Sequence, residues 1–233
     1  MPVERIVILP GMDGTGKLLL EFMQALPGPL RKAISTYVPD VVLSYEQLTT
    51  MVRSLCEDSP PFALMAESFS TPLAIRIAAE RPANLRGLIL CAGFASSPAQ
   101  GIKRRLASAL APLLMRVPLT ERSIRSRLVG QDTPAALVST VREMIASVKP
   151  AVLSARLREV LACDVRADLR RIAVPMLYLR ARHDRLVRPR CLSEIRRIRP
   201  EIRAVTVDGP HLLLQREPQK TAQIVADFVA RLP

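Results

Sequence analysis

Short apolar runs recur along the chain and alternate with segments of helical spacing. Runs of four or five residues, bounded by turn residues, suit strands that are buried on both faces of a sheet. The predicted strands are Ile6–Leu9, Ile34–Val38, Phe62–Met65, Leu88–Cys91, Met176–Leu179 and Ala204–Val207. The predicted helices between them include Lys17–Leu26, Tyr45–Cys56, Pro72–Glu80, Arg190–Ile198 and Pro218–Leu232. This alternation predicts an α/β fold in which a mainly parallel sheet is covered by helices on both faces.

One stretch of the chain breaks this alternation. After residue 96 no strand pattern occurs until residue 164, and three or four helical segments follow one another. Thr120 is suited to cap one of these helices. We therefore expect a single domain whose α/β core comprises residues 1–95 and 165–233. An all-helical cap insertion, residues 96–164, is expected over one end of the sheet.

Composition favours a folded, soluble protein. Of 233 residues, 49% are hydrophobic and 24% are charged, and no apolar run approaches the roughly 18 residues of a membrane span. The first strand begins within a few residues, which leaves no room for a secretory leader, so we expect a cytoplasmic protein. The four cysteines have no CxxC spacing, which predicts neither a zinc site nor a disulfide framework.

Positive charge is concentrated in the second half of the chain. The formal net charge is +13, and residues 96–203 hold 23 basic and 9 acidic side chains, against 8 and 9 in residues 1–95. Such a surface can attract nucleic acid, an anionic membrane or an acidic protein. Aromatic residues make up only 3% of the chain and Trp is absent, so the stacking platforms of many nucleic-acid binders are missing. We expect no nucleic-acid partner and no integral membrane association.

Ser68 stands between a predicted strand and a predicted helix that has Pro72 in its first turn. A sharp strand-to-helix turn can present a serine nucleophile, provided that the residues two before and two after it are small. Here those residues are Ala66 and Ser70. The N-terminus of the following helix also directs backbone N–H groups toward developing negative charge. Taken alone, this short motif is equally consistent with Ser68 acting only as a helix cap.

The chain holds two histidines, His183 and His211, so a histidine base must be one of them. His211 lies between the last predicted strand and the last helix, where a loop can place its imidazole over the carboxyl ends of the strands. Asp184 follows the preceding strand and could hold the imidazole in the required tautomer. The simpler interpretation of Asp184 is an ion pair with a neighbouring arginine. We expect His183 to be a bystander, and Asp208 is the next candidate carboxylate.

The arrangement of these residues resembles that of the α/β-hydrolase superfamily, in which the sequence of the nucleophile turn is usually G-x-S-x-G. The sequence from Ala66 to Ser70 is A-E-S-F-S and departs from that pattern at both glycines. The resemblance implies a serine carboxylesterase in which Ser68 is the nucleophile, His211 the base and Asp184 the orienting acid. The order Ser, Asp, His along the chain matches the family.

The resemblance also implies an oxyanion hole made of backbone N–H groups. One is the N–H of Phe69, and the other, by similarity to the family's H-G-x loop, is that of Met12. Pro10 stands where the family usually has a histidine. The likeness covers nearly the whole chain, except that the family's first antiparallel hairpin is missing. Such a hydrolase needs no metal and no organic cofactor.

The expected helical lid and the basic composition of residues 96–164 resemble those of carrier-protein methyl ester esterases. Residues 96–164 hold eleven basic and five acidic side chains. A basic rim around a pocket could steer an anionic substrate or an acidic acyl carrier protein toward the site. The simpler interpretation is a solvated helical face. The substrate is then a small-molecule ester.

Two other classes of protein compete with an esterase. The run from Gly11 to Lys17 has most of the spacing of a P-loop, but Leu18 stands where a hydroxyl should hold Mg²⁺. The second competitor is a binding protein that keeps this fold without activity, because a fold does not determine a function.

Overall fold

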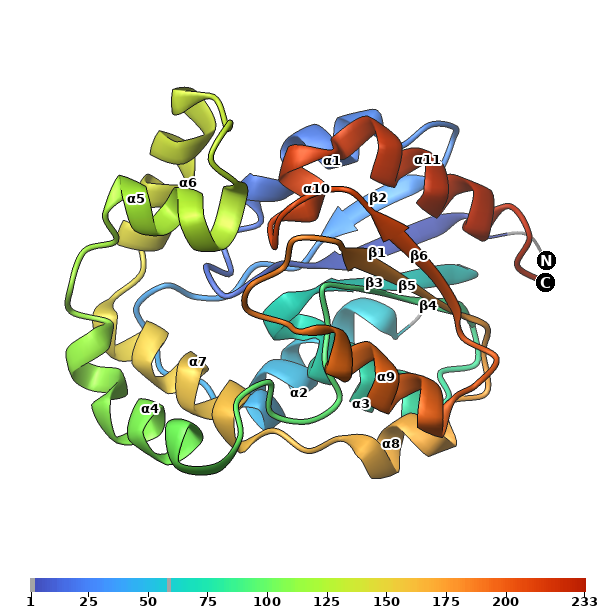
Figure 1. The fold of residues 1–233 in the computed structure, drawn as a ribbon. Coiled ribbons are helices and arrows are strands. Elements are labelled where there is room, and N and C mark those ends of the chain that lie inside the picture. The colour runs from blue at the N-terminus through green and yellow to red at the C-terminus, as the bar shows by residue number, and fades with distance from the viewer. Residues whose placement is uncertain (1–2, 58–59) are drawn as a thin grey trace.

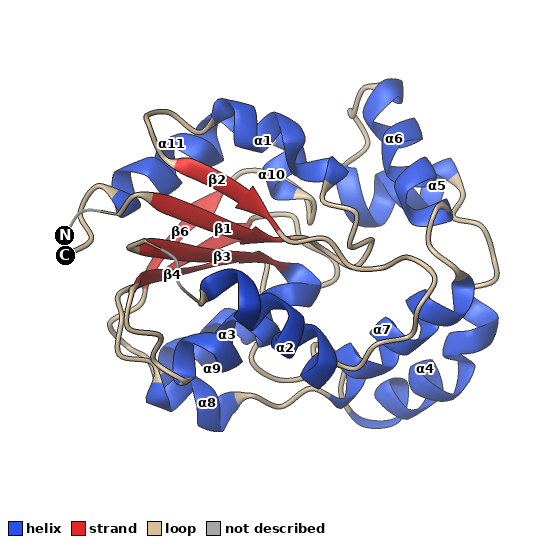
Figure 2. Ribbon diagram, turned by 180° about the vertical axis from the view of Figure 1, so that it is seen from behind, coloured by secondary structure: helices blue, strands red, loops and turns tan. Residues whose placement is uncertain are grey.

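The computed structural model describes residues 3–57 and 60–233, and its centre is a six-stranded sheet (Figures 1 and 2). Every strand pair among the described residues is parallel. The predicted fold class is confirmed. The strands are β1 (Arg5–Leu9), β2 (Arg31–Ile34), β3 (Phe62–Glu67), β4 (Leu85–Cys91), β5 (Met176–Ala181) and β6 (Arg203–Val207).

The order of the strands determines where a ligand can bind. Across the sheet the order is β2-β1-β3-β4-β5-β6, so the chain leaves β1 toward one edge and later builds the rest of the sheet on the other side. The connections that follow β1 and β3 therefore diverge. A crevice forms at such a switch point, outside the carboxyl ends of the two strands.

Alternating side chains of the strands form the two faces of the sheet. Val7 and Leu9 join one hydrophobic cluster, whereas Ile6 and Ile8 join the other. One face is covered by α2 (Tyr45–Cys56), α3 (Thr71–Ala79), α8 (Arg166–Arg171) and α9 (Pro189–Ile198). The opposite face is covered by α1 (Leu20–Ala25), α10 (Leu213–Arg216) and α11 (Pro218–Val229).

The bounds predicted for the second strand are wrong. A strand was expected at Ile34–Val38, but β2 ends at Ile34. It is an edge strand whose residues are only partly buried, which is why Arg31 and Lys32 are tolerated in it. Tyr37, one of the apolar residues in the predicted strand, is 2% exposed and packs against the ring of Phe69 instead of pairing in the sheet.

Between β4 and β5 the described chain is helical. The α-helices of residues 96–164, here called the cap segment, are α4 (Gly101–Leu114), α5 (Glu121–Ile124), α6 (Ala135–Ala146) and α7 (Pro150–Ala162). Thr120 caps α5, and the next turn, Arg125–Val129, is a π-helix. Figures 1 and 2 show these helices beyond the carboxyl ends of the strands. No described helix is long and apolar enough to cross a membrane.

A buried arginine ties the cap segment to the core. Arg156 of α7 is 2% exposed, and its guanidinium donates to the carbonyls of Met12 (2.8 Å), Asp13 (2.9 Å) and Val38 (3.1 Å). It also lies over the ring of Tyr37, 5.7 Å from the centroid. The loop after β1 is thereby fixed by a helix about 140 residues later in the chain.

Replacing Arg156 by Leu should destabilise the protein by about 3 kcal/mol, because three buried carbonyls lose a charged donor. Arg158 lies on the same helix but is exposed, so Arg158→Leu is the matched control, with a cost within about 0.5 kcal/mol. Urea denaturation followed by circular dichroism measures both values. Equal midpoints for the two variants would contradict the tethering role.

Candidate active site

Ser68 has a backbone conformation that few residues adopt. It follows β3 directly and has a φ of 47°, in the left-handed region that is costly for a residue with a Cβ. A 3₁₀ turn, Ser68–Ser70, then leads into α3. Ala66 and Ser70, two residues to either side, are fully buried, so the turn has room only for small side chains there.

Three hydroxyl groups hold this turn in place. Ser70 donates to the carbonyl of Pro10 and lies 2.7 Å from the hydroxyl of Tyr37, which is free to donate to it. The hydroxyl of Tyr45 donates to the carbonyl of Phe69 at 2.7 Å. The Ser70 hydroxyl therefore bonds the loop after β1 to the turn after β3, a link that a glycine at this position could not make.

The structure brings together the three side chains predicted for the site. The Oγ of Ser68 lies 2.9 Å from Nε2 of His211, and Nδ1 of His211 lies 2.7 Å from Oδ2 of Asp184. The other oxygen of Asp184 accepts from the backbone N–H groups of Leu186 and Val187, each at 2.8 Å. An imidazole that donates from Nδ1 to this carboxylate presents Nε2 as an acceptor for the Ser68 hydroxyl.

The environment of His211 favours its protonated form. Its burial lowers the pKa of His211, but the hydrogen bond and charge of Asp184, with a smaller effect of Glu67, outweigh that and raise it. The side chains of His211 and Asp184 are 5% and 4% exposed, so solvent screens their attraction little.

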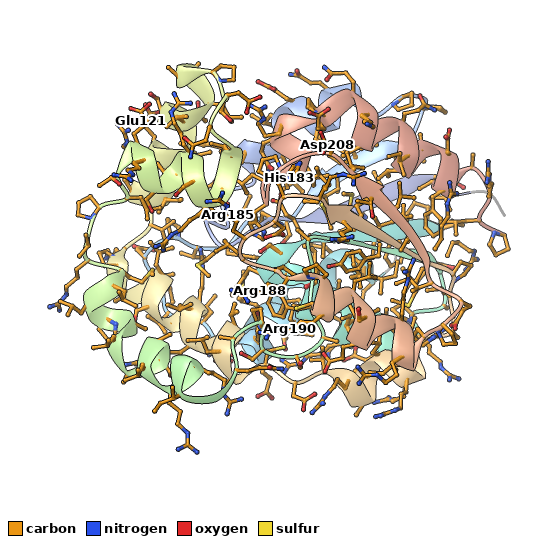
Figure 3. The ribbon with its side chains drawn as sticks, in the orientation of Figure 1. Glu121, His183, Arg185, Arg188, Arg190 and Asp208 are labelled. Carbon is orange, nitrogen blue, oxygen red and sulfur yellow. The ribbon has the colours of Figure 1, made fainter. Side chains whose placement is uncertain are left out.

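His183 and Asp208 form a second, separate histidine–carboxylate pair. Nε2 of His183 lies 2.9 Å from Oδ1 of Asp208, and the side chains are 65% and 69% exposed. Arg182 also approaches Asp208, at 3.3 Å. Figure 3 shows this pair at the surface, near Arg185. The sequence predicted His183 to be uninvolved and Asp208 to be the second choice of carboxylate. Neither takes part in the chain of hydrogen bonds from Ser68.

The two residues expected to supply oxyanion donors lie on either side of the switch point. Phe69 follows Ser68 and is 1% exposed, whereas Met12 belongs to the loop after β1 and lines the same cavity as Ser68. Asp13 braces this loop, because its Oδ2 accepts from the N–H (2.9 Å) and hydroxyl (2.5 Å) of Thr15. With the bonds from Arg156, the loop is fixed before any ligand arrives.

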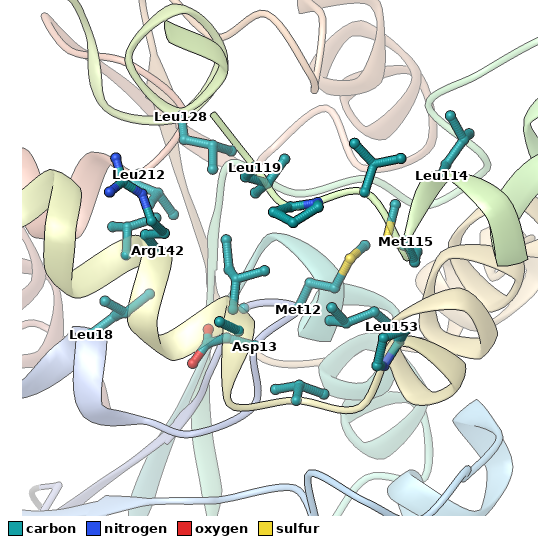
Figure 4. A pocket seen from close by; sticks show the side chains of 18 of the residues that line it. Met12, Asp13, Leu18, Leu114, Met115, Leu119, Leu128, Arg142, Leu153 and Leu212 are labelled. Atoms are coloured by element: carbon teal, nitrogen blue, oxygen red, sulfur yellow. The ribbon is translucent and has the colours of Figure 1, made fainter. Parts of the chain in front are cut away.

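A cavity of about 360 Å³ opens above Ser68 and His211 (Figure 4). Its polar side chains besides those two are Asp13, Arg116 and Arg142. Most of the lining is apolar and comes from the cap segment and from the loops of the core, including Leu18, Leu114, Met115, Val117, Leu119, Leu128, Val141, Ile145, Leu153, Leu186 and Leu212. The arrangement suits an apolar group next to the Ser68 hydroxyl.

Few of the basic side chains of the cap segment reach this cavity. Arg116 and Arg142 line it, and Arg142 lies 3.8 Å from Glu121. Arg125 instead donates hydrogen bonds to the carbonyls of Gln131 and Thr133. It braces the turn between α5 and α6.

Sequence reasoning missed Glu67, the residue before Ser68. Its carboxyl group is 1% exposed, and its Oε2 accepts from Nε2 of Gln215 at 3.2 Å. Its Oε1 has no hydrogen-bond partner among the described residues. Burial raises the pKa of Glu67 to about 7. An acidic residue at the end of an otherwise apolar strand was the signal that could have singled it out.

The described residues hold no group of three His, Cys, Asp or Glu side chains that could bind a metal ion. The four cysteines are free and buried. Burial raises the pKa of Cys91, which lies on β4.

Glu67 should make stability depend on pH. The folded protein keeps a proton on Glu67 up to a pH of about 7, whereas the ordinary value is 4.5, so stability falls as the pH rises between the two. Glu67→Gln should remove this loss. Relative to the native protein, the variant should gain up to about 3 kcal/mol between about pH 5 and pH 8.

Denaturant titrations at the two pH values measure this difference. The exposed Glu46→Gln is the control, and its stability should keep the same pH dependence as the native protein. A Glu67→Gln curve parallel to the native one would show that Glu67 does not hold a proton in the folded state.

Comparisons with known proteins show the family and the fold of this chain. A model of the family described as serine aminopeptidase, S33, matches residues 31–202, a range that includes Ser68 and Asp184 but ends before His211. The fold is similar to that of the enol-lactonase from Burkholderia xenovorans LB400, with a TM-score of 0.78 and 18% identity over 98% of this chain and 92% of that chain. It is also similar to a thermophilic esterase from Thermogutta terrifontis, with a TM-score of 0.81 and 19% identity over 98% and 91%.

A third similar fold is that of a hydrolase from Oleispira antarctica, with a TM-score of 0.85 and 11% identity over 99% of this chain and 92% of that chain. The search of curated proteins finds no match. The family match covers well over half of the chain, and this protein is a hydrolase that belongs to the S33 family of the α/β-hydrolase superfamily.

Proposed function

We propose that this hydrolase is a serine esterase that cleaves a carboxylic ester through an acyl-enzyme. The observation that carries the proposal is the unbroken chain of hydrogen bonds from Ser68 through His211 to Asp184, at the floor of an apolar cavity. Ser68 Oγ attacks the acyl carbon while Nε2 of His211 takes its proton, and Asp184 stabilises the imidazolium. His211 then returns the proton to the leaving alcohol, and water repeats the cycle.

Negative charge on the carbonyl oxygen of the tetrahedral intermediate needs fixed donors. We assign this role to the backbone N–H groups of Phe69 and Met12. Two observations support the assignment. Phe69 lies within the 3₁₀ turn Ser68–Ser70, directly after Ser68, and Arg156 fixes the Met12 loop through a hydrogen bond to the Met12 carbonyl. Donors held in place before the reaction cost no reorganisation when the charge develops.

The lining of the cavity supports an ester with an apolar acyl group. A free amino terminus, as in an aminopeptidase substrate, would call for an available carboxylate in the cavity. The lining carboxylate is Asp13, whose Oδ2 is already engaged by Thr15. The leucine and methionine side chains around it fit a hydrocarbon chain better than a peptide.

A second candidate function is hydrolysis of an acyl ester delivered by an acidic acyl carrier protein. The observation in its favour is that Arg116 and Arg142 line the cavity. These side chains could attract the phosphate or carboxylate groups of such a substrate. Both candidate functions use the same three catalytic side chains. They differ in whether the ester arrives as a free small molecule or bound to a carrier protein.

Ser68→Ala should abolish hydrolysis of p-nitrophenyl esters and leave the fold intact. The rate should fall by about 10³-fold or more, since the nucleophile is lost while the cavity remains. A panel of acyl lengths, assayed by release of p-nitrophenol, gives both the activity and its chain preference. If the native protein hydrolysed none of these esters but bound them, a non-catalytic binding protein would replace the proposal.

The second histidine–carboxylate pair provides a matched control within the same chain. His211→Ala should cost about 10³-fold or more, and Asp184→Asn should also lower the rate strongly by favouring the wrong tautomer. His183→Ala and Asp208→Asn should leave the rate within about twofold of native, because that pair lies apart from Ser68. The opposite ranking of the two pairs would refute the assignment of His211 as the base.

A further inference from the structure

Helix α4 and the residues after it expose an unusual amount of apolar surface. Ile102 is 74% exposed, Leu113 is 62% exposed and Val117 is 61% exposed. Six of the large hydrophobic side chains that the described chain exposes fall within this one segment, namely Ile102, Leu106, Leu110, Leu113, Leu114 and Val117. We call these six the α4 stripe. A contiguous exposed apolar surface indicates an interaction site.

The helical members of the α4 stripe share one face of the helix. Ile102, Leu106 and Leu110 follow one another at intervals of four residues, and Leu113 and Leu114 continue the row. The other face is already used, since Ala111 is fully buried and α4 packs against α7. Figures 1 and 2 both show α4 at the outside of the molecule, with α7 between it and the core. Ile102, Leu106 and Leu110 therefore point away from the protein, and the far end of the stripe reaches the cavity.

Positive charge flanks the α4 stripe. The sequence from Gly101 to Thr120 holds no acidic residue. Arg104, Arg105 and Arg116 are exposed, and none of the three has an ion pair among the described residues. A broad apolar face flanked by unpaired arginines fits a partner with an apolar interior and anionic groups at its surface.

We propose that the α4 stripe docks this protein onto an anionic lipid–water interface. A second copy of the chain fits less well, because a two-fold contact would bring the same arginines of both copies together. The carboxylates of an acidic carrier protein would match the arginines, but carboxylates leave the row of five leucine and isoleucine side chains without an apolar partner. A lipid monolayer supplies both, with acyl chains for the stripe and phosphates for the arginines.

The position of the stripe connects it to the cavity. Leu114 and Val117 belong to the stripe and also line the cavity above Ser68, as does Met115 between them. Docking through α4 places that side of the cavity against the lipid surface. An ester amphiphile could then move from the lipid layer to Ser68 without its acyl chain crossing water. This last step rests on the proposed function, whereas docking does not.

Docking is tested with the Ser68→Ala protein, which binds without turnover, by sedimentation with vesicles of phosphatidylglycerol and phosphatidylcholine. Three substitutions of the stripe outside the cavity lining should weaken binding by about tenfold or more. They are Ile102→Gln, Leu106→Gln and Leu110→Gln, combined in one variant. The matched control combines three exposed apolar residues of the core, Leu20→Gln, Val42→Gln and Met51→Gln, and should change binding by less than about twofold.

The charge requirement has its own pair of variants. Arg104→Glu with Arg105→Glu should weaken binding to the anionic vesicles, and added salt should reduce the difference. Arg196→Glu with Arg197→Glu changes the same charge on the exposed side of α9 and should have little effect. Vesicles of phosphatidylcholine alone should bind the native protein more weakly than the mixed vesicles.

Several outcomes would overturn the docking proposal. The first is that the native protein does not sediment with anionic vesicles. The second is that the stripe variant and its control sediment equally. The third is that the stripe variant loses self-association but still binds vesicles. Binding of the stripe to an acidic acyl carrier protein in place of vesicles would assign the surface to that partner. In the protein with Ser68 intact, the stripe variant should keep its rate on a soluble p-nitrophenyl ester, so loss of docking is distinguishable from loss of catalysis.

Discussion

The left-handed turn at Ser68 is the constraint on which the rest of the site depends. A serine with a φ of 47° is unfavourable in itself, so the surrounding structure has to impose it. Strand β3 holds the start of the turn and α3 holds its end, and the hydrogen bonds from Ser70 and Tyr45 fix the turn against neighbouring elements. The same turn places the Ser68 hydroxyl next to His211 and leads directly into α3. Strain and function are therefore located in the same residues.

The order of the strands explains why distant segments meet at this turn. Because β1 and β3 are neighbours with diverging connections, the Met12 loop and the Ser68 turn lie side by side at the carboxyl edge of the sheet. Asp184 follows β5 and His211 follows β6, at the same edge. Arg156 then fixes the cap segment to the Met12 loop, so one buried side chain positions both the cap side of the cavity and this loop.

Much of the fold could be predicted because its signals are local. Apolar runs and helical spacing locate the parallel sheet, and the strand-to-helix transition singles out Ser68. Edge strand β2 could not be placed correctly, since its own residues are partly polar and the apolar Tyr37 belongs to a tertiary contact. Arg156 could not be found either, because only the folded chain buries it and its sequence neighbours give no sign of burial. Glu67 carried one local signal, an acidic residue at the end of an apolar strand, but the lack of a hydrogen-bond partner for its Oε1 among the described residues is visible only in the folded chain.

The exposure of the α4 stripe could not be predicted from the sequence. Its spacing reads as an ordinary amphipathic helix whose apolar face is buried in the protein. Only the structure shows that α4 uses the alanine side for packing and turns its larger apolar side chains outward. Positive charge in the cap segment was visible in the sequence, but most of those arginines lie away from the cavity. Among the basic side chains of this segment that the structure describes, Arg116 and Arg142 alone line it.

Covalent trapping at Ser68 tests the central claim most directly. A fluorophosphonate ester reacts with a serine that a neighbouring imidazole activates, and it mimics the tetrahedral intermediate. Peptide mass spectrometry of the native protein should find one adduct, on Ser68, and the adduct should form much more slowly in His211→Ala. An adduct on another serine, or no adduct on a folded protein that hydrolyses esters, would contradict the account.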